Sequence, residues 1–198
     1  MENHAGKMGI VFPTFEEYPN RVSKEDVVAY LPESDTMQYS AEDIKRFFAD
    51  KNIESLLIIN PDNPSGNYIA YNELLGLIAW AKERGISLVV DESFVDFVDV
   101  EGEFSLLHDD ILARNPHLCV VKSISKSYGV PGFRLGVLAS GNKALIAGMK
   151  KEVAIWNINS FGEFYMQIYE KYHGDYLRAC KLFREERARE LFWEGHRR

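Results

Sequence analysis

The sequence predicts an α/β fold, a three-layer sandwich in which helices cover a mainly parallel sheet. Short apolar segments alternate with amphipathic helical segments, which is the order typical of parallel strands joined by helices. The apolar segments lead into loops that carry proline, asparagine, aspartate and serine. With 198 residues, 46% of them hydrophobic and 27% charged, the chain has the size and composition of one globular domain, or of one domain and part of another.

The first half of the chain predicts three strands and two helices. A proline follows each of the first two apolar segments and ends it. Ser40 is expected to cap a helix, because Asp43 stands three positions later, where a capping box places an acid. Gly85 ends the next helix. The strands are predicted over 8–12, 27–31 and 55–59, and the helices over 40–51 and 71–84.

The second half adds three strands and then becomes helical after Asn142. Its last helix contains the charged run 184–187, which we expect to be a solvated face with ion pairs four positions apart. This run is not expected to bind a ligand. The strands are predicted over 86–90, 117–121 and 134–139, and the helices over 143–150, 158–172 and 176–193.

Charge and cysteine content limit the classes of partner and compartment. A formal net charge of −7 argues against nucleic acid or an anionic membrane surface as the main partner, since both favour a basic face. No apolar run approaches a membrane span, and residues 1–7 lack the apolar stretch of a signal peptide. Cys119 and Cys180 are isolated, so we expect buried or partly buried thiols, no metal site and a cytoplasmic protein.

Lys126 follows the apolar segment 117–121 together with side chains suited to an anion. Ser123, Ser125 and Arg134 are donors for a phosphate, and nearby glycines let the main chain approach it closely. Ligands bind at the carboxyl ends of strands in open α/β sheets. A lysine there is expected to lose part of its hydration, which frees its amine to attack a carbonyl. A lone lysine is usually a surface charge, so the hypothesis depends on these neighbours.

Two further polar side chains are predicted at the same edge of the sheet. Asp91 follows an apolar strand and emerges from the sheet floor, and Asn63 lies in a loop bounded by prolines. A phosphate site, an amine, a buried carboxylate and a neutral amide together suit pyridoxal 5′-phosphate (PLP). Lys126 would form a Schiff base with it, Asp91 would pair with its ring nitrogen, and Asn63 would donate to its phenolate oxygen. The phosphate would be held by Ser123, Ser125 and Arg134.

At these residues the sequence resembles the class I/II aminotransferases, a family of fold-type I PLP-dependent enzymes. Residues 60–66 resemble the motif Asn-Pro-x-Asn-Pro-Thr-Gly, residues 91–94 resemble Asp-Glu-Ala-Tyr, and residues 123–136 resemble the lysine and arginine motif. Within the family, the resemblance is closest to histidinol-phosphate aminotransferase and threonine-phosphate decarboxylase. The match at residues 13–18 implies that Phe15 stacks on the cofactor ring.

The resemblance implies a PLP-dependent aminotransferase that moves an amino group between an amino acid, or an amino-acid phosphate, and a 2-oxo acid. Lys126 and Asp91 are then its catalytic residues, with Lys126 as general base and acid. A decarboxylase like the threonine-phosphate enzyme and a PLP-fold protein without activity stay open as alternatives. Phe94 stands where the family usually has a tyrosine, which leans toward the decarboxylase. Trp156 is expected either to line the substrate side or to be a core residue.

The resemblance covers residues 8–195, yet family members are considerably longer. Their N-terminal stretch and their small C-terminal domain, whose arginine binds the substrate carboxylate, have no counterpart here. We therefore expect residues 1–172 to be the PLP-binding large domain without its N-terminal part, and residues 173–198 to be a helix leading toward an absent small domain. Weak or absent transaminase activity and an exposed sheet edge are expected of this chain alone. A homodimer is expected once the missing segments are supplied.

Two features of the sequence also suit other kinds of site. Leu88 to Glu92 fit the magnesium-binding strand of P-loop ATPases, but the Gly-x-x-x-x-Gly-Lys loop that should accompany it is absent from the sequence. The acids at positions 91, 92, 96 and 99 would suit a metal site only if they shared a face, and neighbouring strand positions face opposite sides of the sheet. Asp96 and Asp99 are therefore expected to be surface acids.

Overall fold

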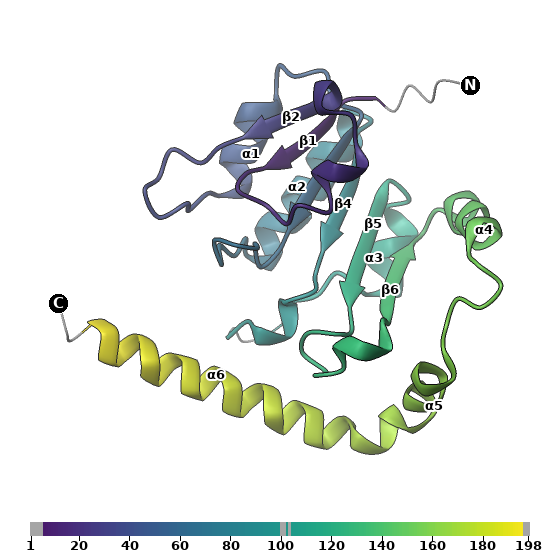
Figure 1. The fold of residues 1–198 in the computed structure, drawn as a ribbon. Coiled ribbons are helices and arrows are strands. Elements are labelled where there is room, and N and C mark those ends of the chain that lie inside the picture. The colour runs from purple at the N-terminus through teal and green to yellow at the C-terminus, as the bar shows by residue number, and fades with distance from the viewer. Residues whose placement is uncertain (1–5, 100–101, 103, 196–198) are drawn as a thin grey trace.

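The computed structural model describes residues 6–99, 102 and 104–195. Its strands are β1 (Met8–Val11), β2 (Val27–Tyr30), β3 (Ser55–Ile59), β4 (Ser87–Asp91), β5 (Leu118–Ser123) and β6 (Gly136–Ser140). They form one sheet in the order β2-β1-β3-β4-β5-β6 (Figure 1). Neighbouring strands are parallel except that β6 runs antiparallel to β5. The predicted α/β fold with a mainly parallel sheet is confirmed.

The direction of β6 follows from its short connection to β5. Residues 124–135 contain only the 3₁₀ turn η4 (Pro131–Phe133), whereas a parallel crossover usually needs an α-helix. Strand β6 is also an edge of the sheet, because within the described residues it pairs only with β5. Val137 and Leu138 of this edge are 40% and 36% exposed. An exposed sheet edge was expected, and β6 forms it.

The helices are α1 (Ala41–Phe48), α2 (Tyr71–Glu83), α3 (Asp109–Arg114), α4 (Lys143–Glu152), α5 (Ser160–Ile168) and α6 (His173–Gly195). The capping box of α1 is present: Asp43 N–H donates to Ser40 Oγ at 3.2 Å, and Ser40 N–H donates to Asp43 Oδ2 at 3.0 Å. The single helix predicted over 158–172 is divided, because the 3₁₀ turn η5 (Tyr169–Tyr172) follows α5. The short α3 was not predicted, and no side chain caps it.

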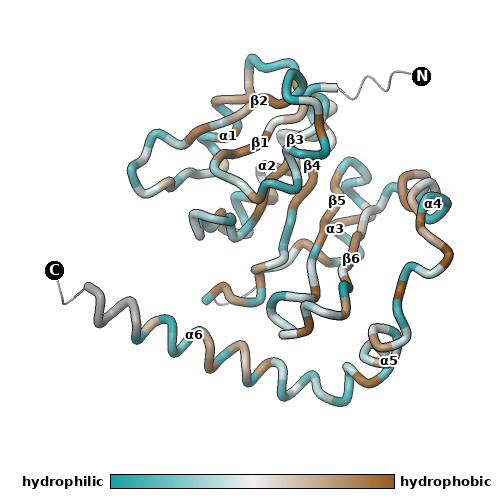
Figure 2. The backbone as a smooth tube through the Cα atoms, in the orientation of Figure 1, coloured by the Kyte–Doolittle hydropathy of each residue, from teal (hydrophilic) through white to brown (hydrophobic). Residues whose placement is uncertain are grey.

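Helices α1 and α2 cover one face of the sheet and enclose the main hydrophobic core (Figure 1). Ile44 and Phe48 of α1 and Leu77 of α2 are 0% exposed. Figure 2 shows hydrophobic segments along the strands that these helices cover. Their partners in the sheet include Leu56, Ile58, Leu88, Val90 and Leu118. Burial of this surface, at about 25 cal/mol per Å² of apolar area, is what holds strands and helices together.

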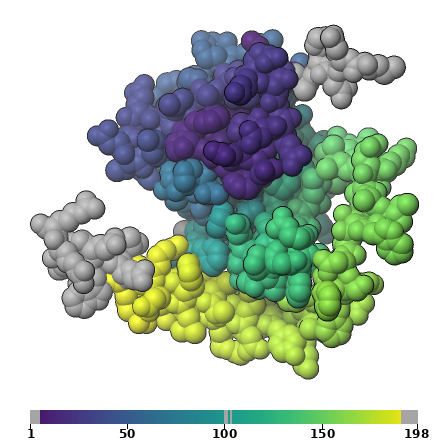
Figure 3. All heavy atoms as spheres, in the orientation of Figure 1, coloured from purple at the N-terminus to yellow at the C-terminus, as the bar shows by residue number. Residues whose placement is uncertain are grey.

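Helix α6 lies outside this core and runs past the carboxyl ends of β4 and β5 (Figure 1). Figure 3 shows its atoms, in yellow-green, packed along that edge of the molecule. Arg184 Nη1 donates to the Asp96 carbonyl at 3.0 Å, and Arg187 Nη1 donates to the Phe97 carbonyl at 2.9 Å. The expectation that residues 184–187 form only a solvated face was therefore incomplete, because two of the arginines hold the helix in place.

The exposure of Trp156 and of the two cysteines can be compared with the predictions from the sequence. Trp156 is 91% exposed, so of the two alternatives for it the core residue is wrong, and the substrate-side role stays a prediction. Cys180 is buried and Cys119 is half-buried, and both are free thiols, as expected. None of the helices in the described part of the chain is both long and apolar enough to cross a membrane.

Candidate active site

A hollow of about 480 Å³ opens at the carboxyl ends of β3, β4 and β5, next to the start of β6. All the side chains that the sequence predicted for the site line this hollow. Its position is the one where open α/β sheets bind ligands. The predicted side chains are Phe15, Asn63, Asp91, Ser123, Ser125, Lys126 and Arg134.

The register of the sheet brings these residues together. Ile59 of β3 pairs with Asp91 of β4, and Asp91 pairs with Val121 of β5. Asn60 N–H donates to the Asp91 carbonyl at 2.8 Å, and Glu92 N–H donates to the Val121 carbonyl at 2.8 Å. Because three parallel strands end at one level, the loops that follow them meet around the hollow.

Asp91 is held rigidly at the base of the hollow. Its side chain is buried, and Oδ1 accepts hydrogen bonds from Ser93 N–H at 2.8 Å and from Ser93 Oγ at 2.5 Å. Ser93 Oγ in turn accepts from Ser123 N–H at 2.9 Å, which ties the ends of β4 and β5 together. Both hydrogen bonds from Ser93 are made to Oδ1, and they fix the orientation of the carboxylate. Oδ2 accepts no hydrogen bond from Ser93.

Tyr18 is a site residue that the sequence reasoning did not identify. Its hydroxyl donates to Asp91 Oδ2 at 2.5 Å, and it lines the hollow. Burial and the neighbouring Asp91 carboxylate raise the pKa of Tyr18, so the phenol stays a neutral donor. Its ring also meets the ring of Phe15 edge to face, with centroids 6.1 Å apart. The signal available in the sequence was its place in the same short segment as Phe15.

The loop that carries Asn63 is ordered by its own side chains. Asn60, which is buried, donates from Nδ2 to the Ile69 carbonyl at 3.0 Å and accepts from Ile69 N–H at 2.8 Å. Asp62 accepts from Ser65 N–H at 3.2 Å and from the Ser65 hydroxyl. The rigid loop expected from the sequence is present, and it places the Asn63 amide at the wall of the hollow.

The donors suited to a phosphate lie on the loop between β5 and β6. Ser125 is buried, and its N–H donates to Ser123 Oγ at 3.3 Å. Arg134 is exposed and adopts a left-handed backbone conformation with φ 55° and ψ 41°, which is strained for a residue other than glycine. Hydroxyls and a guanidinium on one loop provide charge-assisted hydrogen bonds to an anion, worth about 1.5–3 kcal/mol each.

Lys126 lies beside these donors, with its amine near the ring of Phe94. The distance from Nζ to the ring centroid is 5.5 Å, a cation–π arrangement. Lys126 is exposed, so the expectation that burial strips part of its hydration is wrong for the chain as described. Phe94 lacks the hydroxyl of the tyrosine in the related motif, so the amine meets the ring face alone. An exposed amine at the rim can be reached by an incoming carbonyl compound.

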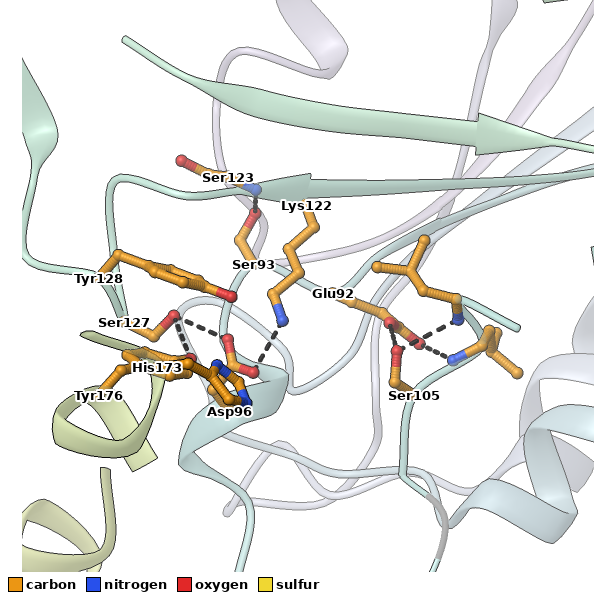
Figure 4. A network of polar contacts seen from close by, with 12 residues as sticks. Glu92, Ser93, Asp96, Ser105, Lys122, Ser123, Ser127, Tyr128, His173 and Tyr176 are labelled. Atoms are coloured by element: carbon orange, nitrogen blue, oxygen red, sulfur yellow. Dashed lines mark hydrogen bonds and ion pairs between the residues drawn. The ribbon is translucent and has the colours of Figure 1, made fainter. Parts of the chain in front are cut away.

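Asp96 corrects another expectation from the sequence. Its carboxylate forms an ion pair with Lys122, with 2.7 Å between Oδ1 and Nζ (Figure 4). The two side chains are only 12% and 11% exposed, so Asp96 is not a surface acid. The sequence could not show this, because Lys122, near the end of β5, lies 26 positions from Asp96 along the chain. Asp99, in contrast, is exposed as expected.

Glu92 faces away from the hollow, on the other side of β4 from Asp91. It is 0% exposed, and its carboxylate accepts from Ser105 Oγ at 2.6 Å and from Leu106 N–H at 2.7 Å (Figure 4). Burial raises the pKa of Glu92. Its contacts join the end of β4 to the segment before α3, so we assign it a structural role.

Comparisons with known proteins agree on one family. A family model described as aminotransferase class I and II matches residues 10–166. The chain is 32% identical over 197 residues to the L-serine phosphate decarboxylase Cj1436c of Campylobacter jejuni, covering 92% of this chain and 50% of that protein. It is 32% identical over 155 residues to the threonine-phosphate decarboxylase of Salmonella typhimurium, covering 76% and 41%. The chain thus spans about half the length, or less, of these relatives.

Solved structures show the same fold. A decarboxylase from Sulfurospirillum multivorans superposes with a TM-score of 0.79 at 27% identity, over 95% of this chain and 54% of that one. The histidinol-phosphate aminotransferase from Clostridium acetobutylicum also gives 0.79, at 26% identity over 96% and 56%. Cystalysin from Treponema denticola, which contains pyridoxal 5′-phosphate, shares the fold with a TM-score of 0.70 at 19% identity.

Proposed function

The chain belongs to the family of class I and II aminotransferases, and from this premise we propose that it carries the cofactor-binding part of a PLP-dependent enzyme that acts on amino acids. One observation carries the proposal: Lys126, Asp91 and a loop of phosphate-suited donors line a single hollow. These groups differ in chemistry, and each matches a different part of PLP. When bound, PLP supplies an electron sink for reactions at the α-carbon of an amino acid.

The donor set in the hollow fits this cofactor. Asp91 offers one carboxylate oxygen, Oδ2, whose partner is the neutral Tyr18 hydroxyl, and this oxygen is suited to a protonated ring nitrogen. Asn63 offers an amide for the phenolate oxygen, and the aromatic ring of Phe15 can cover a flat ligand and exclude water from it. The phosphate would be held by Ser123, Ser125 and Arg134.

Two residues would carry the chemistry. The Lys126 amine would hold the cofactor by its aldehyde carbon, and as general base and acid it would move the proton at the substrate α-carbon. Asp91 would hold the cofactor at its ring nitrogen and favour the protonated form there, because its carboxylate is buried and oriented by Ser93. A carboxylate held by two hydrogen bonds on one oxygen is preorganised for this role.

Decarboxylation of a phosphorylated amino acid and transfer of its amino group are two candidate reactions. Relatives that cover more than nine-tenths of this chain include L-serine phosphate decarboxylases, which favours decarboxylation of an amino-acid phosphate. Aminotransfer to a 2-oxo acid is the second candidate, favoured by the family description. Residues 1–172 would form the large domain and residues 173–198 a helix toward a further domain, with a homodimer formed once the remaining segments are supplied.

Reductive labelling tests the cofactor site directly. The full chain is mixed with PLP, reduced with sodium borohydride, digested and examined by mass spectrometry. We expect a pyridoxyl label on Lys126 in the wild type, no label at that position in Lys126→Ala, and wild-type labelling in Lys143→Ala, which changes an exposed lysine of α4. A wild type without label on Lys126, or equal labelling of exposed lysines in general, would contradict the proposal.

An assay with a single substrate distinguishes decarboxylation from aminotransfer. The reconstituted chain is given O-phospho-L-serine with and without a 2-oxo acid. Release of CO₂ that needs no 2-oxo acid indicates decarboxylation, whereas formation of a new amino acid from the 2-oxo acid indicates aminotransfer. Because this chain spans about half of its relatives, we expect low turnover, and labelling without any turnover would favour the PLP-binding protein without activity.

A further inference from the structure

We infer that helix α6 orders the loop that carries Lys126, through a partly buried polar network in which Tyr176 is a positioning residue. The anchoring network consists of Lys122, Asp96, Ser127 and Tyr176 (Figure 4). It lies next to the hollow, and the side chains of Asp96, Ser127 and Tyr176 are not among those that line it. The positioning role rests on the function proposed for Lys126, whereas the ordering of the loop does not.

The centre of the anchoring network is the carboxylate of Asp96, which holds two separate segments. Oδ1 lies 2.7 Å from Lys122 Nζ, and Oδ2 accepts from Ser127 Oγ at 2.7 Å. Lys122 is the residue before Ser123 at the end of β5, and Ser127 is the residue after Lys126. One carboxylate therefore joins the strand end to the position next to the proposed catalytic lysine.

The ion pair between Lys122 and Asp96 is shielded from water, and it therefore favours one conformation of the loop. The Lys122 and Asp96 side chains are 11% and 12% exposed. A buried ion pair adds little net stability, but removal of one partner leaves an uncompensated charge, so the pair strongly disfavours other arrangements. The loop conformation that satisfies both oxygens of Asp96 is thereby selected over its alternatives.

Tyr176 brings α6 into this arrangement. Its hydroxyl donates to Ser127 Oγ at 3.1 Å, so the Ser127 hydroxyl both accepts from the helix and donates to Asp96. The Tyr176 ring stacks on Tyr128, with centroids 4.2 Å apart and planes 9° apart. Burial raises the pKa of Tyr176, which keeps it a neutral donor. Both residues that follow Lys126, Ser127 and Tyr128, are thus held by one side chain of α6.

Helix α6 has few other ways to be seated on the molecule. Of its residues up to 189, only Cys180 is buried. Arg184 and Arg187 add hydrogen bonds to the carbonyls of Asp96 and Phe97, next to the same carboxylate. The helix therefore docks at the turn that carries Asp96 by directional polar contacts and by the ring contact between Phe183 and Phe97, and through Ser127 its position affects the loop.

Residues 159–169 also hold the loop, because Asn159 Nδ2 donates to the Phe133 carbonyl at 3.0 Å and the Tyr169 hydroxyl donates to the Tyr128 hydroxyl at 3.2 Å. Among these contacts from outside, the one that α6 makes with Ser127 is nearest to Lys126 along the chain.

The loop has few main-chain hydrogen bonds of its own. Within residues 124–135, Gly129 N–H donates to the Lys126 carbonyl at 3.1 Å, and Ile124 N–H closes the loop on the Leu135 carbonyl at 3.1 Å. Gly129 and Arg134 have positive φ values of 65° and 55°, and Lys126 is exposed. A loop with one strained residue, Arg134, and an exposed functional residue needs support from outside, and the anchoring network supplies it next to Lys126.

Amide hydrogen exchange of the full chain without cofactor tests the inference. The variant Tyr176→Phe removes one hydroxyl and keeps the ring stack, and Tyr172→Phe is its control, since Tyr172 is 48% exposed and its hydroxyl has no hydrogen bond within the described residues. We expect peptides from residues 123–136 to exchange about two- to tenfold faster in Tyr176→Phe and at the wild-type rate in Tyr172→Phe. Peptides from β3 should be unchanged, because a general loss of stability would accelerate them too.

Hydrogen exchange in a second variant and the rate of Lys126 labelling distinguish a failure of this inference from a failure of the proposed function. Ser127→Ala should accelerate exchange in the same peptides, and it replaces Tyr176→Phe as the deciding variant if that protein does not fold. Labelling of Lys126 by PLP and borohydride should slow in both variants by a similar factor. Unchanged exchange in both would overturn the inference. A protected wild-type loop that is accelerated in Tyr176→Phe but never labelled at Lys126 would contradict the proposed function while supporting the ordering of the loop by α6.

Discussion

The helices that cover the sheet and the helices that follow it are held by different interactions. Phe48 of α1 and Leu77 of α2 are 0% exposed, whereas Phe164 of α5 is 60% exposed. Helix α6 reaches the sheet end through hydrogen bonds and an aromatic contact between Phe183 and Phe97, with centroids 4.7 Å apart. The first region is stabilised by buried apolar area and the second by a small number of directional contacts.

This difference matters because the candidate site lies between the two regions. Asp91 belongs to the rigid sheet, and Lys126 lies on a loop that also contacts α6 through Ser127. Regions with few buried contacts open at a lower free energy than the global unfolding. We therefore expect the carboxylate side of the site to remain fixed while the lysine side responds to the position of α6.

The largest effect is expected from a cavity in the core. Phe48→Ala should lower the free energy of unfolding by about 3–5 kcal/mol, because it removes a fully buried ring and leaves a void. Phe164→Ala, the matched change on α5, should alter it by less than about 0.5 kcal/mol. Urea unfolding followed by circular dichroism measures both. A similar decrease in the free energy of unfolding in the two variants would show that α5 is stabilised by buried apolar area as the core is.

An intermediate effect is expected from Glu92, where the sheet meets the segment before α3. Burial raises its pKa, with Asp96 acting in the same direction and Lys122, Ser105 and Leu106 opposing it. As the pH rises, the unfolded chain releases this proton first, so the stability contribution present at low pH is lost as the pH passes the folded pKa.

The variant Glu92→Gln resembles the protonated form and isolates this effect. The stability of the wild type should fall relative to Glu92→Gln as the pH rises from about 4, near the ordinary glutamate pKa. Glu83→Gln, on an exposed position of α2, is the control and should follow the wild type. Urea midpoints between acidic and neutral pH measure the difference. A constant gap between wild type and Glu92→Gln would exclude Glu92 as the titrating group.

The smallest effect is expected at the helix caps, and it sharpens the same comparison. Ser40→Ala removes the capping box of α1 and should cost about 1 kcal/mol of global stability, because α1 unfolds with the core. Asn142 caps α4 by accepting from Leu145 N–H at 3.0 Å. Asn142→Ala should accelerate hydrogen exchange in α4 with a smaller change in the urea midpoint. Equal changes in the midpoint would mean that α4 unfolds together with the sheet.

Much of the site could be predicted from the sequence, because the end of each strand is indicated by a few neighbouring residues. The apolar segments before Asp91, before Ser123 and before the loop of Asn63 are short and end in polar residues, and all three strands were predicted within a few residues of their bounds. Since parallel strands end at one edge, the residues after them were expected to meet, and they line one hollow. The roles assigned to these residues stay predictions until the labelling is done.

Contacts between distant segments could not be read in this way. Tyr18 binds Asp91 across 73 positions, and Lys122 binds Asp96 across 26. The large aromatic side chain of Trp156 favours a core position, yet Trp156 is 91% exposed. Composition describes what a side chain prefers, whereas its burial depends on which elements are present around it.

The sequence by itself determined the strands, the helices of the core and the polar residues that follow each strand, because alternation, capping and turn residues act over a few positions. The tertiary structure alone decided that β6 is antiparallel, that the Tyr18 hydroxyl donates to Asp91, and that Asp96 forms a shielded ion pair with Lys122. The physical reason is that these features need two segments to be brought together by the sheet, and no local pattern encodes the partner of a side chain.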